Sequence, residues 1–388
     1  MKIGIFTECY KPVLNGVVNS IVGFKTGLEK LGHEVYIFCP TYKNFKDDPK
    51  DKNIIHCPSV PLPGNSGYHY IYNFNKDILK IAKQMDIIHV QHPFIMGQHA
   101  VKASKKLNKI LVFTNHTQYD HYTHYIPFFK KAVIKEIIKY IRKFSKNINM
   151  IVAPAKGIEN KLRSLNVKTP ITIVPNGIDV KRFKIKYPEK DKQNIRKKYN
   201  IEKNDYVFVY SGRIADEKNL SFLLKAFKKI NKNISNSKLL LIGGGVGINK
   251  YQKLIDKLHL NNKAIITDFI DYEKVPSYLS LGKIYITASK SEVHPLTILE
   301  GLAAGLPMVI LNAPGTGDIV TDGLDGLVAK NNIDDFVNKV IKLAKDKSLY
   351  KKLSSNALKT ADKYSYIETS KQMEKLYLKI IQNAKIKS

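Results

Sequence analysis

The stretch that decides the fold reads SKSEVHPLTILEGLAAGLPMVI and covers residues 289–310. It follows the apolar strand IYITAS (284–289), passes through a polar turn into a helix, and reaches another apolar strand after the break Gly-Leu-Pro (305–307). A strand, a helix and a strand in this order indicate a parallel β-sheet covered by helices. The turn places Glu292 before the helix, and Glu300 lies about two turns inside it.

Two glutamates in these positions predict a site for a sugar joined to a phosphate. A carboxylate before a helix can accept hydrogen bonds from hydroxyl groups, and the free amides of the first helical turn can hold an anion. The alternative is that one of them is an ordinary surface carboxylate and the other only caps the helix. Their spacing alone favours that alternative, and only the flanking residues make the run specific.

The chain is too long for one ordinary hydrophobic core. Its 388 residues, 44% of them hydrophobic, predict two domains. Short apolar strands alternate with amphipathic helices in both halves, which indicates two Rossmann-like α/β domains with parallel sheets. We expect the first domain at 1–175, a Lys-, Asn- and Pro-rich linker at 176–200, the second domain at 201–365, and a final helix at 366–388.

The expected elements follow the apolar runs of the sequence. In the first half we expect strands at 2–6, 34–40, 86–91, 110–116 and 150–155, with helices near 17–31, 97–107 and 128–146. In the second half we expect strands at 206–212, 238–245, 264–269, 283–289 and 307–311, with helices near 219–230 and 250–259. Ligands of open parallel sheets bind at the carboxyl ends of the strands, so the loops after these strands are the first places to search.

Composition restricts the location and the partners of the chain. No apolar run approaches the ~20 residues of a membrane-spanning helix, and KIGIF (2–6) opens the chain without a signal peptide, so we expect a cytoplasmic protein. The cysteines have no metal-ligand spacing and fit reduced thiols; they are Cys9, Cys39 and Cys57. The net charge of +31 fits nucleic acid or an anionic membrane as partner, although Lys-rich compositions also arise in AT-rich genomes.

Arg213 and Lys218 carry the strongest signal for a phosphate site. Arg213 leaves a strand end in SGRIADEKNL (211–220), and Lys218 stands at the start of the next helix, so both cations could converge on one anion. Arginine supplies a planar fork for oxygens, and lysine supplies a point charge. The alternative is a surface ion pair with Asp216 or Glu217.

Glycine-containing loops follow two other strands. Asn15 and Gly16 precede a helix, where glycine permits close approach of the backbone to a ligand, although the pair alone is an ordinary turn. Gly243 and Gly244 belong to LIGGGVG (241–247), which lacks the G-x-G-x-x-G pattern after the first strand of a domain. We therefore expect no dinucleotide cofactor.

Histidines gather in two loops of the first half, around 86–97 and 112–124. They are His89, His92, His116, His121 and His124. We do not expect a metal site, because a step of three residues along a strand points to opposite faces and no cysteine accompanies them. A histidine at a strand end, such as His116, is more often packed in a core than bound to a ligand.

Together these motifs resemble those of the retaining GT-B glycosyltransferases of family 4. The E-x7-E run at 292–300, the G-R-x4-K run at 212–218, the Asn-Gly loop and VPNGID (174–179) match the family's motifs in order along nearly the whole chain. The resemblance implies a GT-B fold, with two Rossmann-like domains facing a central cleft and a C-terminal helix crossing back onto the N-terminal domain. It also implies transfer of a sugar from a nucleoside-diphosphate sugar, with retention at the anomeric carbon.

The resemblance assigns a role to each matching residue of the donor site. Glu292 is similar to the carboxylate that binds hydroxyls of the donor sugar, and Glu300 to the one that binds the ribose. Arg213 and Lys218 match the pair that neutralises the leaving diphosphate, and His116 matches the histidine of the donor sugar. We expect four of these residues to be catalytic: His116, Arg213, Lys218 and Glu292.

The other residues of the expected donor site also come from the resemblance. They are Asn15, Gly16, Gly243 and Gly244, which the family places near the phosphates or the base. The sequence departs from the family after Glu292, where the usual Gly-Leu is replaced by Pro295-Leu296. Proline has no N–H, so the amides expected to meet the diphosphate are those of Leu296 and Thr297. This change, beside His294, puts the identity of the donor sugar in doubt more than the type of reaction.

Neither a metal nor a cofactor is expected. The sequence has no D-x-D motif to hold a metal on the diphosphate, and Arg213 with Lys218 can carry that charge instead. A divalent ion as an additive stays an alternative, and the nucleotide sugar is a co-substrate. Because no carboxylate is placed as a nucleophile, same-face attack is favoured, in which the leaving phosphate accepts the proton of the acceptor.

The stretch PFFKKAVIKEIIKYIRKFSKNINM (127–150) predicts a cationic amphipathic helix. Phe128 and Phe129 open it, and Glu136 is the one acidic residue from 130 to 146. The basic residues of that segment are Lys130, Lys131, Lys135, Lys139, Arg142, Lys143 and Lys146. Such a helix suits an anionic bilayer surface. The alternative is a solvated helix that packs its apolar stripe on the sheet.

The favoured function is transfer of a hexose, with UDP-glucose as the expected donor, to a membrane lipid such as 1,2-diacylglycerol. The basic helix and the N-terminal loop resemble those of family members that glucosylate diacylglycerol, which implies a peripheral enzyme on the inner face of the cell membrane. A soluble glycosyltransferase acting on a polysaccharide, a teichoic acid or a small molecule is the main alternative, and a sugar-nucleotide epimerase is another. A nucleic-acid-binding protein is the alternative outside enzymes, but the chain has few arginines and no nucleic-acid-binding motif.

Overall fold

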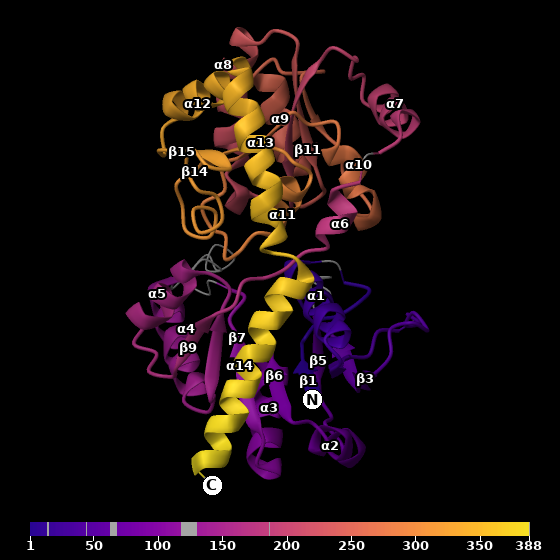
Figure 1. Ribbon diagram of the computed structural model, residues 1–388, viewed down its shortest axis with the longest axis vertical. Coiled ribbons are helices and arrows are strands. Elements are labelled where there is room, and N and C mark those ends of the chain that lie inside the picture. Colours follow the sequence, from indigo (N-terminus) through magenta and orange to yellow (C-terminus); the bar gives the residue numbers. More distant parts are fainter. Residues whose placement is uncertain (14, 44, 63–67, 118–129, 186, 388) are drawn as a thin grey trace. The chain divides into compact units, whose positions relative to one another are not determined.

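The computed structural model describes residues 1–13, 15–43, 45–62, 68–117, 130–185 and 187–387, with the backbone alone at 130, 131 and 387. The chain divides into two compact units (Figure 1). The N-terminal unit consists of Met1–Ile178 and Tyr366–Ser388, and the C-terminal unit consists of Asp179–Ser365.

The N-terminal unit is built on a seven-stranded parallel sheet in the order β3-β2-β1-β6-β7-β8-β9. Its strands are β1 (Lys2–Phe6), β2 (Glu34–Pro40), β3 (Ile54–Cys57), β6 (Ile87–Val90), β7 (Ile110–Thr114), β8 (Met150–Ala153) and β9 (Ile171–Ile173). A separate antiparallel ribbon pairs β4 (Ser59–Pro61) with β5 (His69–Ile71). The helices are α1 (Gly16–Lys30), α2 (Lys76–Lys83), α3 (Ile95–Leu107), α4 (Lys130–Ser145), α5 (Lys156–Ser164) and α14 (Tyr366–Lys387).

The last helix belongs to the N-terminal unit because α1 offers it a glycine-lined face. A Cβ atom at Gly23 would lie 2.2 Å from the ring of Tyr366, and one at Gly27 would lie 2.5 Å from the Tyr366 carbonyl oxygen. The two helices therefore approach closely only because these side chains are absent. Tyr377 of α14 is fully buried in the core of this unit, and Figure 1 shows α14 in yellow along it.

The C-terminal unit is built on a six-stranded parallel sheet in the order β12-β11-β10-β13-β14-β15. Its strands are β10 (Tyr206–Ser211), β11 (Ser237–Ile242), β12 (Ala264–Ile266), β13 (Ile284–Thr287), β14 (Met308–Leu311) and β15 (Gly326–Ala329). The helices are α6 (Val180–Phe183), α7 (Glu189–Lys198), α8 (Leu220–Asn233), α9 (Ile248–Lys257), α10 (Val275–Leu279), α11 (Leu296–Ala303), α12 (Ile333–Lys345) and α13 (Lys347–Asp362), with 3-10 turns at Asp216–Lys218 and Tyr272–Lys274.

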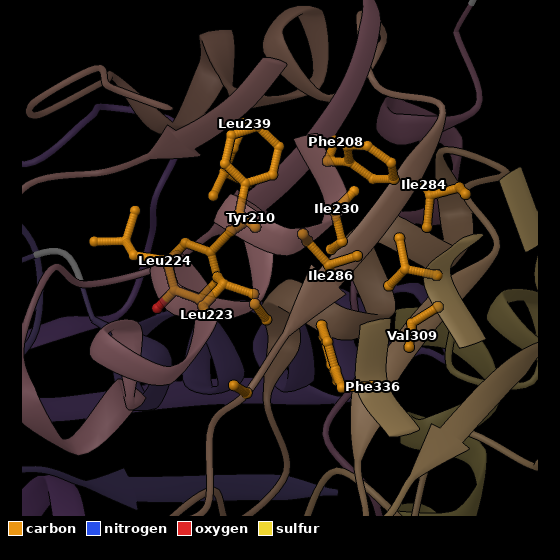
Figure 2. Packing of buried hydrophobic residues seen from close by; sticks show 14 of the residues in the cluster. Phe208, Tyr210, Leu223, Leu224, Ile230, Leu239, Ile284, Ile286, Val309 and Phe336 are labelled. Atoms are coloured by element: carbon orange, nitrogen blue, oxygen red, sulfur yellow. The ribbon is translucent and has the colours of Figure 1, made fainter. Parts of the chain in front are cut away.

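The core of the C-terminal unit lies between the sheet and the helices that cover it. Buried side chains of β10 and β13 meet those of α8 and α12, and Figure 2 shows the cluster around Phe208, Leu223, Ile286 and Phe336. All six residues of β11 are buried, as expected for a strand covered on both faces. In both sheets the strand order reverses beside the first strand of the unit, between β1 and β6 and between β10 and β13, as in Rossmann-like domains, so the predicted α/β architecture is confirmed.

The segment expected as a linker at 176–200 is partly helical. Asp179 accepts a hydrogen bond from the Arg182 amide and starts α6, and Pro188 precedes the first residue of α7. Val180 and Phe183 are buried, which attaches α6 to the C-terminal unit. The polar composition of the segment conceals these few buried side chains, so the sequence did not predict α6 and α7.

Candidate active site

The expected donor-binding residues of the C-terminal unit follow the two strands at which the strand order reverses. Arg213 and Lys218 come after β10, and Glu292 comes after its sheet neighbour β13. Parallel strands bring these carboxyl-terminal loops to the same edge of the sheet, which is where ligands of this fold bind. The topology therefore places residues separated by about seventy positions in one local site, and the contact between Lys218 and Glu292 confirms it.

Glu292 is held as an ionised carboxylate. Burial raises its pKa, but the charge of Lys218, with Nζ 2.7 Å from Oε1, and the hydroxyl of Ser289 at 2.8 Å more than compensate, so its pKa lies below the usual value. The loop is supported from behind by Gly315, whose φ is +80° and where a Cβ would lie 2.3 Å from the Glu292 carbonyl oxygen. Glu292 is thus an oriented acceptor for hydroxyl groups.

The two cations after β10 contact different carboxylates. Arg213 lies 2.6 Å from Oε1 of Glu217, whereas Lys218 contacts Glu292. Arg213 is more than half exposed, and Lys218 is largely buried. The surface ion pair with Glu217 that the sequence left open is therefore present.

The glycine-rich loop supports the Arg213 loop, a role that the sequence did not reveal. A Cβ at Gly243, whose φ is +138°, would lie 2.2 Å from the Gly212 carbonyl oxygen. The Ile214 amide donates to the Gly244 carbonyl oxygen at 2.8 Å, and the Gly247 amide donates to the Ile214 carbonyl oxygen at 2.9 Å. Gly243 is thus required for two backbones to meet, and its expected place beside a nucleotide stays a prediction.

The start of α11 keeps the two amides that the sequence selected. Pro295 is the N-cap residue of α11 and provides no side-chain cap, and the Ile298 amide donates to its carbonyl oxygen at 3.2 Å. Within the described ranges, no hydrogen-bond acceptor is recorded for the amides of Leu296 and Thr297. They are the amides of α11 that can meet an anion.

Glu300 is fully enclosed and is held by a tyrosine that the sequence gave no reason to select. Tyr272 donates a hydrogen bond to Oε1 of Glu300 at 2.9 Å. The Arg182 guanidinium lies 5.3 Å from the centre of the Tyr272 ring and pairs with Glu273 at 2.9 Å. Burial raises the pKa of Glu300 to about 7, against the lowering effects of Tyr272 and Arg182. This carboxyl therefore titrates near neutral pH.

His294, which precedes the departure from the family pattern at Pro295, points into the fold. Its ring is buried and lies 5.4 Å from the ring of Tyr364, between centroids. Burial lowers its pKa to about 3, so the imidazole is neutral at physiological pH. This contact with Tyr364, which follows α13, gives His294 a structural role beside the Glu292 loop.

In the N-terminal unit, Asn15 and Gly16 begin α1. Asn15 is the N-cap residue and accepts a hydrogen bond from the Val18 amide at 2.9 Å. Gly16 is exposed, and a Cβ at this position would meet no atom within 4 Å. The protein itself therefore does not require glycine here, which fits a position kept small for a ligand.

His116 lies at the carboxyl end of β7 and is oriented by Gln91. The Oε1 atom of Gln91 lies 2.7 Å from Nε2 of His116, so Nε2 carries the proton and Nδ1 is an acceptor. Burial, with a smaller contribution from His92 and His89, holds the pKa of His116 well below its usual value. A neutral imidazole at this strand end can form hydrogen bonds with a sugar hydroxyl.

The neighbouring histidines are structural. His89 bridges the Tyr377 hydroxyl at 2.6 Å and the Thr114 hydroxyl at 2.7 Å, and Nδ1 of His92 accepts from the Glu8 amide at 3.2 Å. His121 and His124 lie outside the described residues. Within the part of the chain that the structure describes, no group of three or more His, Cys, Asp or Glu side chains could hold a metal ion.

Glu8, which the sequence did not single out, fixes the loop after β1 to α3. Its side chain is buried and accepts a hydrogen bond from the Met96 amide at 3.1 Å, in the first turn of α3. Burial raises the pKa of Glu8 to about 7. The residue carries no sequence motif, and only the fold brings it to a helix start.

The basic residues of α4 are exposed where the structure describes them. Lys135, Lys139, Arg142 and Lys143 face solvent, as does Lys146 just after the helix. Phe128 and Phe129 lie outside the described residues, as do the side chains of Lys130 and Lys131.

The apolar stripe of α4 is buried only in its second half. Ile141 and Phe144 are buried, whereas Val133 and Ile137 are only half-buried. An open apolar groove beside these turns is lined by Phe94, Ala132, Val133, Glu136, Ile137 and Tyr140. The first half of α4 therefore presents cations and apolar side chains together.

Comparison with known proteins gives the same domain order. The profile of the family described as Glycosyltransferase Family 4 matches residues 14–182, and that of Glycosyl transferases group 1 matches residues 191–360. An α-monoglucosyldiacylglycerol synthase of Acholeplasma laidlawii is 32% identical over 98% of both chains. A protein of the same name from Streptococcus pneumoniae is 32% identical over 84% of this chain and 74% of its own.

Solved structures agree at the level of the fold. A sucrose-phosphate synthase of Thermosynechococcus elongatus superposes with a TM-score of 0.78 at 17% identity, covering 98% of this chain and 99% of its own. The Anabaena protein HepE, solved with UDP, superposes with a TM-score of 0.73 at 16% identity, covering 97% and 99%. With its two matching domains and a relative that it matches from end to end, the chain belongs to the GT-B glycosyltransferases of this family, as its motifs predicted.

Proposed function

We propose that the protein transfers glucose from UDP-glucose to 1,2-diacylglycerol with retention at the anomeric carbon. The observation that carries the proposal is the end-to-end match to an α-monoglucosyldiacylglycerol synthase, at 98% coverage of both chains. The sugar of UDP-glucose is α-linked, and the product named for this relative is also α-linked, so the proposed reaction retains configuration.

The C-terminal unit supplies groups suited to the donor. Glu292, held ionised by Lys218, is the proposed acceptor for hydroxyls of the glucose, and Glu300 is the proposed acceptor for the ribose. Arg213, Lys218 and the amides of Leu296 and Thr297 would stabilise the diphosphate as its charge grows. This set of cations and amides needs no metal, and we propose that none is required.

The reaction exchanges one bond to the anomeric carbon for another. The bond to the β-phosphate oxygen breaks, a bond to the glycerol hydroxyl oxygen forms on the same face, and the hydroxyl proton passes to the departing UDP. His116, neutral and with Nδ1 as acceptor, is suited to hold a hydroxyl of the glucose during this exchange. No carboxylate nucleophile is required in this scheme.

The lipid acceptor is supported by the surface of α4. Exposed Lys135 and Lys139 can approach anionic headgroups, and the groove beside Val133 and Ile137 offers apolar contact to an acyl chain. No helix among the described residues is long and apolar enough to span a bilayer. We propose that the enzyme binds the inner face of the cell membrane as a peripheral protein.

The test is incubation with labelled UDP-glucose, UDP-galactose or GDP-mannose and diacylglycerol in vesicles containing anionic phosphatidylglycerol. We expect a labelled glycolipid from UDP-glucose, with an α-anomeric signal in its NMR spectrum. Label in a polysaccharide or small-molecule acceptor, with none in the lipid, would overturn the lipid assignment. A β-linked product would overturn retention.

A further inference from the structure

The β4–β5 ribbon of the N-terminal unit has one face attached to the protein and one face turned to solvent. Its register pairs Ser59 with Ile71 and Val60 with Tyr70. Ile71 is buried. The ring of His69, two positions before it and on the same face, lies 4.6 Å from the ring of Tyr42, between centroids. Side chains alternate between the faces of a strand, so the residues next to these point the other way.

The solvent-facing side of the ribbon is apolar. Four exposed residues, which we call the ribbon face, contribute to it: Val60 and Tyr70, which pair with each other, and Leu62 and Tyr72, each one residue beyond its strand; they are 48%, 47%, 38% and 59% exposed. Tyr68, opposite Leu62, packs against the core of the unit instead. Single exposed apolar residues are ordinary, but four on one small ribbon form a patch that soluble surfaces rarely leave open. The outward face of an antiparallel ribbon is normally polar, so this composition calls for an occupant.

The ribbon and α4 both contact the same turn of α3. Nε2 of His99 lies 3.2 Å from the carbonyl oxygen of Ile71, and Nε2 of the preceding residue, Gln98, donates to the Tyr140 hydroxyl of α4 at 2.8 Å. Phe94, 42% exposed, precedes α3 and stacks on Tyr140. Neighbouring residues of α3 therefore contact the backbone of the ribbon and Tyr140 of α4.

Charge and side-chain chemistry favour a bilayer as the occupant. Exposed Lys43 follows Tyr42, which packs on the ribbon, and exposed Lys76 follows Tyr72 by four positions. The net charge of +31 makes an anionic surface the complementary one. Tyrosines beside aliphatic residues suit the boundary between headgroups and acyl chains, where the ring is desolvated and the hydroxyl stays wet.

We propose that the ribbon face enters the headgroup region of an anionic bilayer and is a second membrane contact of the N-terminal unit, besides α4. This inference rests on the proposed lipid acceptor. Two separate contacts on one rigid unit would fix how the unit stands on the bilayer, whereas one helix alone would leave it free to roll.

The first test uses the absence of tryptophan from the chain, which makes Tyr72→Trp the single tryptophan of the full-length protein, so that it can be excited selectively, apart from the tyrosines. With vesicles of phosphatidylcholine and phosphatidylglycerol, we expect a blue shift of its emission and quenching by brominated lipid. The matched control is Leu324→Trp, also exposed but in the C-terminal unit, which we expect to show neither. Unchanged emission of Tyr72→Trp on protein that co-sediments with vesicles would overturn the proposal.

The second test replaces all four residues of the ribbon face by serine. Loss of this apolar area predicts weaker vesicle co-sedimentation by roughly tenfold or more. The control carries Ile185→Ser and Leu324→Ser, two exposed aliphatic residues of the C-terminal unit, and we expect it to bind vesicles like the parent. Circular dichroism shows whether the fourfold variant is folded, and if it is not, the Tyr72→Trp result decides alone.

The outcomes separate this inference from the function on which it rests. If the parent glucosylates diacylglycerol and the folded fourfold variant co-sediments as well as the parent, the ribbon proposal fails and the proposed function stands. If the parent binds no vesicles, both fail. If the parent is a dimer in solution and the fourfold variant is a monomer, the ribbon face is an interface between copies, and the membrane proposal is overturned.

Discussion

In the C-terminal unit, Glu292 and Glu300 each have a hydrogen-bonding partner in the same unit, Lys218 and Tyr272, whereas in the N-terminal unit the cations of α4 are exposed to solvent. The proposed donor site is thus built by the protein before any ligand binds. The proposed acceptor surface consists of exposed cations, although Lys139 pairs with exposed Glu136 and Arg142 donates to the Leu165 carbonyl oxygen. The first kind of site tolerates little change, and the second responds gradually to charge and area.

We expect the largest loss of activity from substitutions in the Glu292–Lys218 pair. Removing an oriented polar group that acts on the transition state costs about 10²- to 10³-fold, so we expect Glu292→Ala to lower kcat/KM for UDP-glucose by that factor. Steady-state kinetics with labelled donor measures it.

The partner of this pair provides the control. Lys218→Ala should cause a similar loss, and the double variant should lose less than the product of the two single losses, because the two groups act together. Near-normal transfer by either single variant would contradict the assignment of this pair to the donor site.

Two glycines, Gly243 and Gly16, extend the comparison of the two units to the free energy of unfolding. Gly243→Ala forces a Cβ against the Gly212 carbonyl oxygen at 2.2 Å and a φ of +138° on alanine, so we expect a loss of about 2–4 kcal/mol. Urea unfolding followed by circular dichroism measures this loss.

Gly16→Ala is the matched substitution in the N-terminal unit, where a Cβ meets nothing within 4 Å. We expect its stability to stay within about 1 kcal/mol of the parent while transfer falls, because the methyl group occupies space kept for the donor. Normal transfer by this variant would remove Gly16 from the site.

Charge reversal on α4 should act on membrane binding and not on the donor. Each basic residue near an anionic surface contributes about 1 kcal/mol, so Lys135→Glu with Lys139→Glu should weaken vesicle binding by at least roughly 30-fold. Co-sedimentation across a range of salt concentrations measures it, and the difference should shrink as salt rises.

The control for α4 reverses two exposed lysines of α13, Lys351→Glu with Lys352→Glu, and gives the same change in net charge. We expect it to bind vesicles almost like the parent. Equal losses in the two variants would show that total charge, and not the surface of α4, determines binding.

The donor half of the site could be predicted from the sequence because its residues follow strands of fixed order. Parallel topology brings Lys218 and Glu292 together, and the resemblance of the flanking residues to the family's motifs, not the spacing alone, selected them. The Asn15 cap and the departure at Pro295 were readable for the same reason, since each is a local property of a helix start.

What the sequence could not reveal depends on contacts between distant segments. Tyr272 and Arg182 carry no motif and reach Glu300 only through the fold, and Gly243 resembles a ligand loop although its Cβ space is filled by Gly212. The ribbon face was missed because β4 and β5 are three-residue strands, too short for alternation to show. Helices α6 and α7 were missed because few of their residues are apolar.

The smallest expected effect tests whether the pre-built donor site is also tuned by pH. Tyr272→Phe removes the hydrogen bond to Glu300, which contributes about 1 kcal/mol, so we expect KM for UDP-glucose to rise roughly five- to tenfold at pH 7.

Only the carboxylate form of Glu300 accepts hydrogen bonds from both ribose hydroxyls. With its pKa raised to about 7, KM for UDP-glucose should fall as pH rises through that value. The Tyr272 hydroxyl lowers this pKa, so its removal should move the profile to higher pH. Tyr278→Phe, which alters a nearby tyrosine with no hydrogen bond to Glu300, should leave the profile in place. A profile that shifts equally in both variants would mean that Tyr272 acts by packing and does not set the ionisation of Glu300.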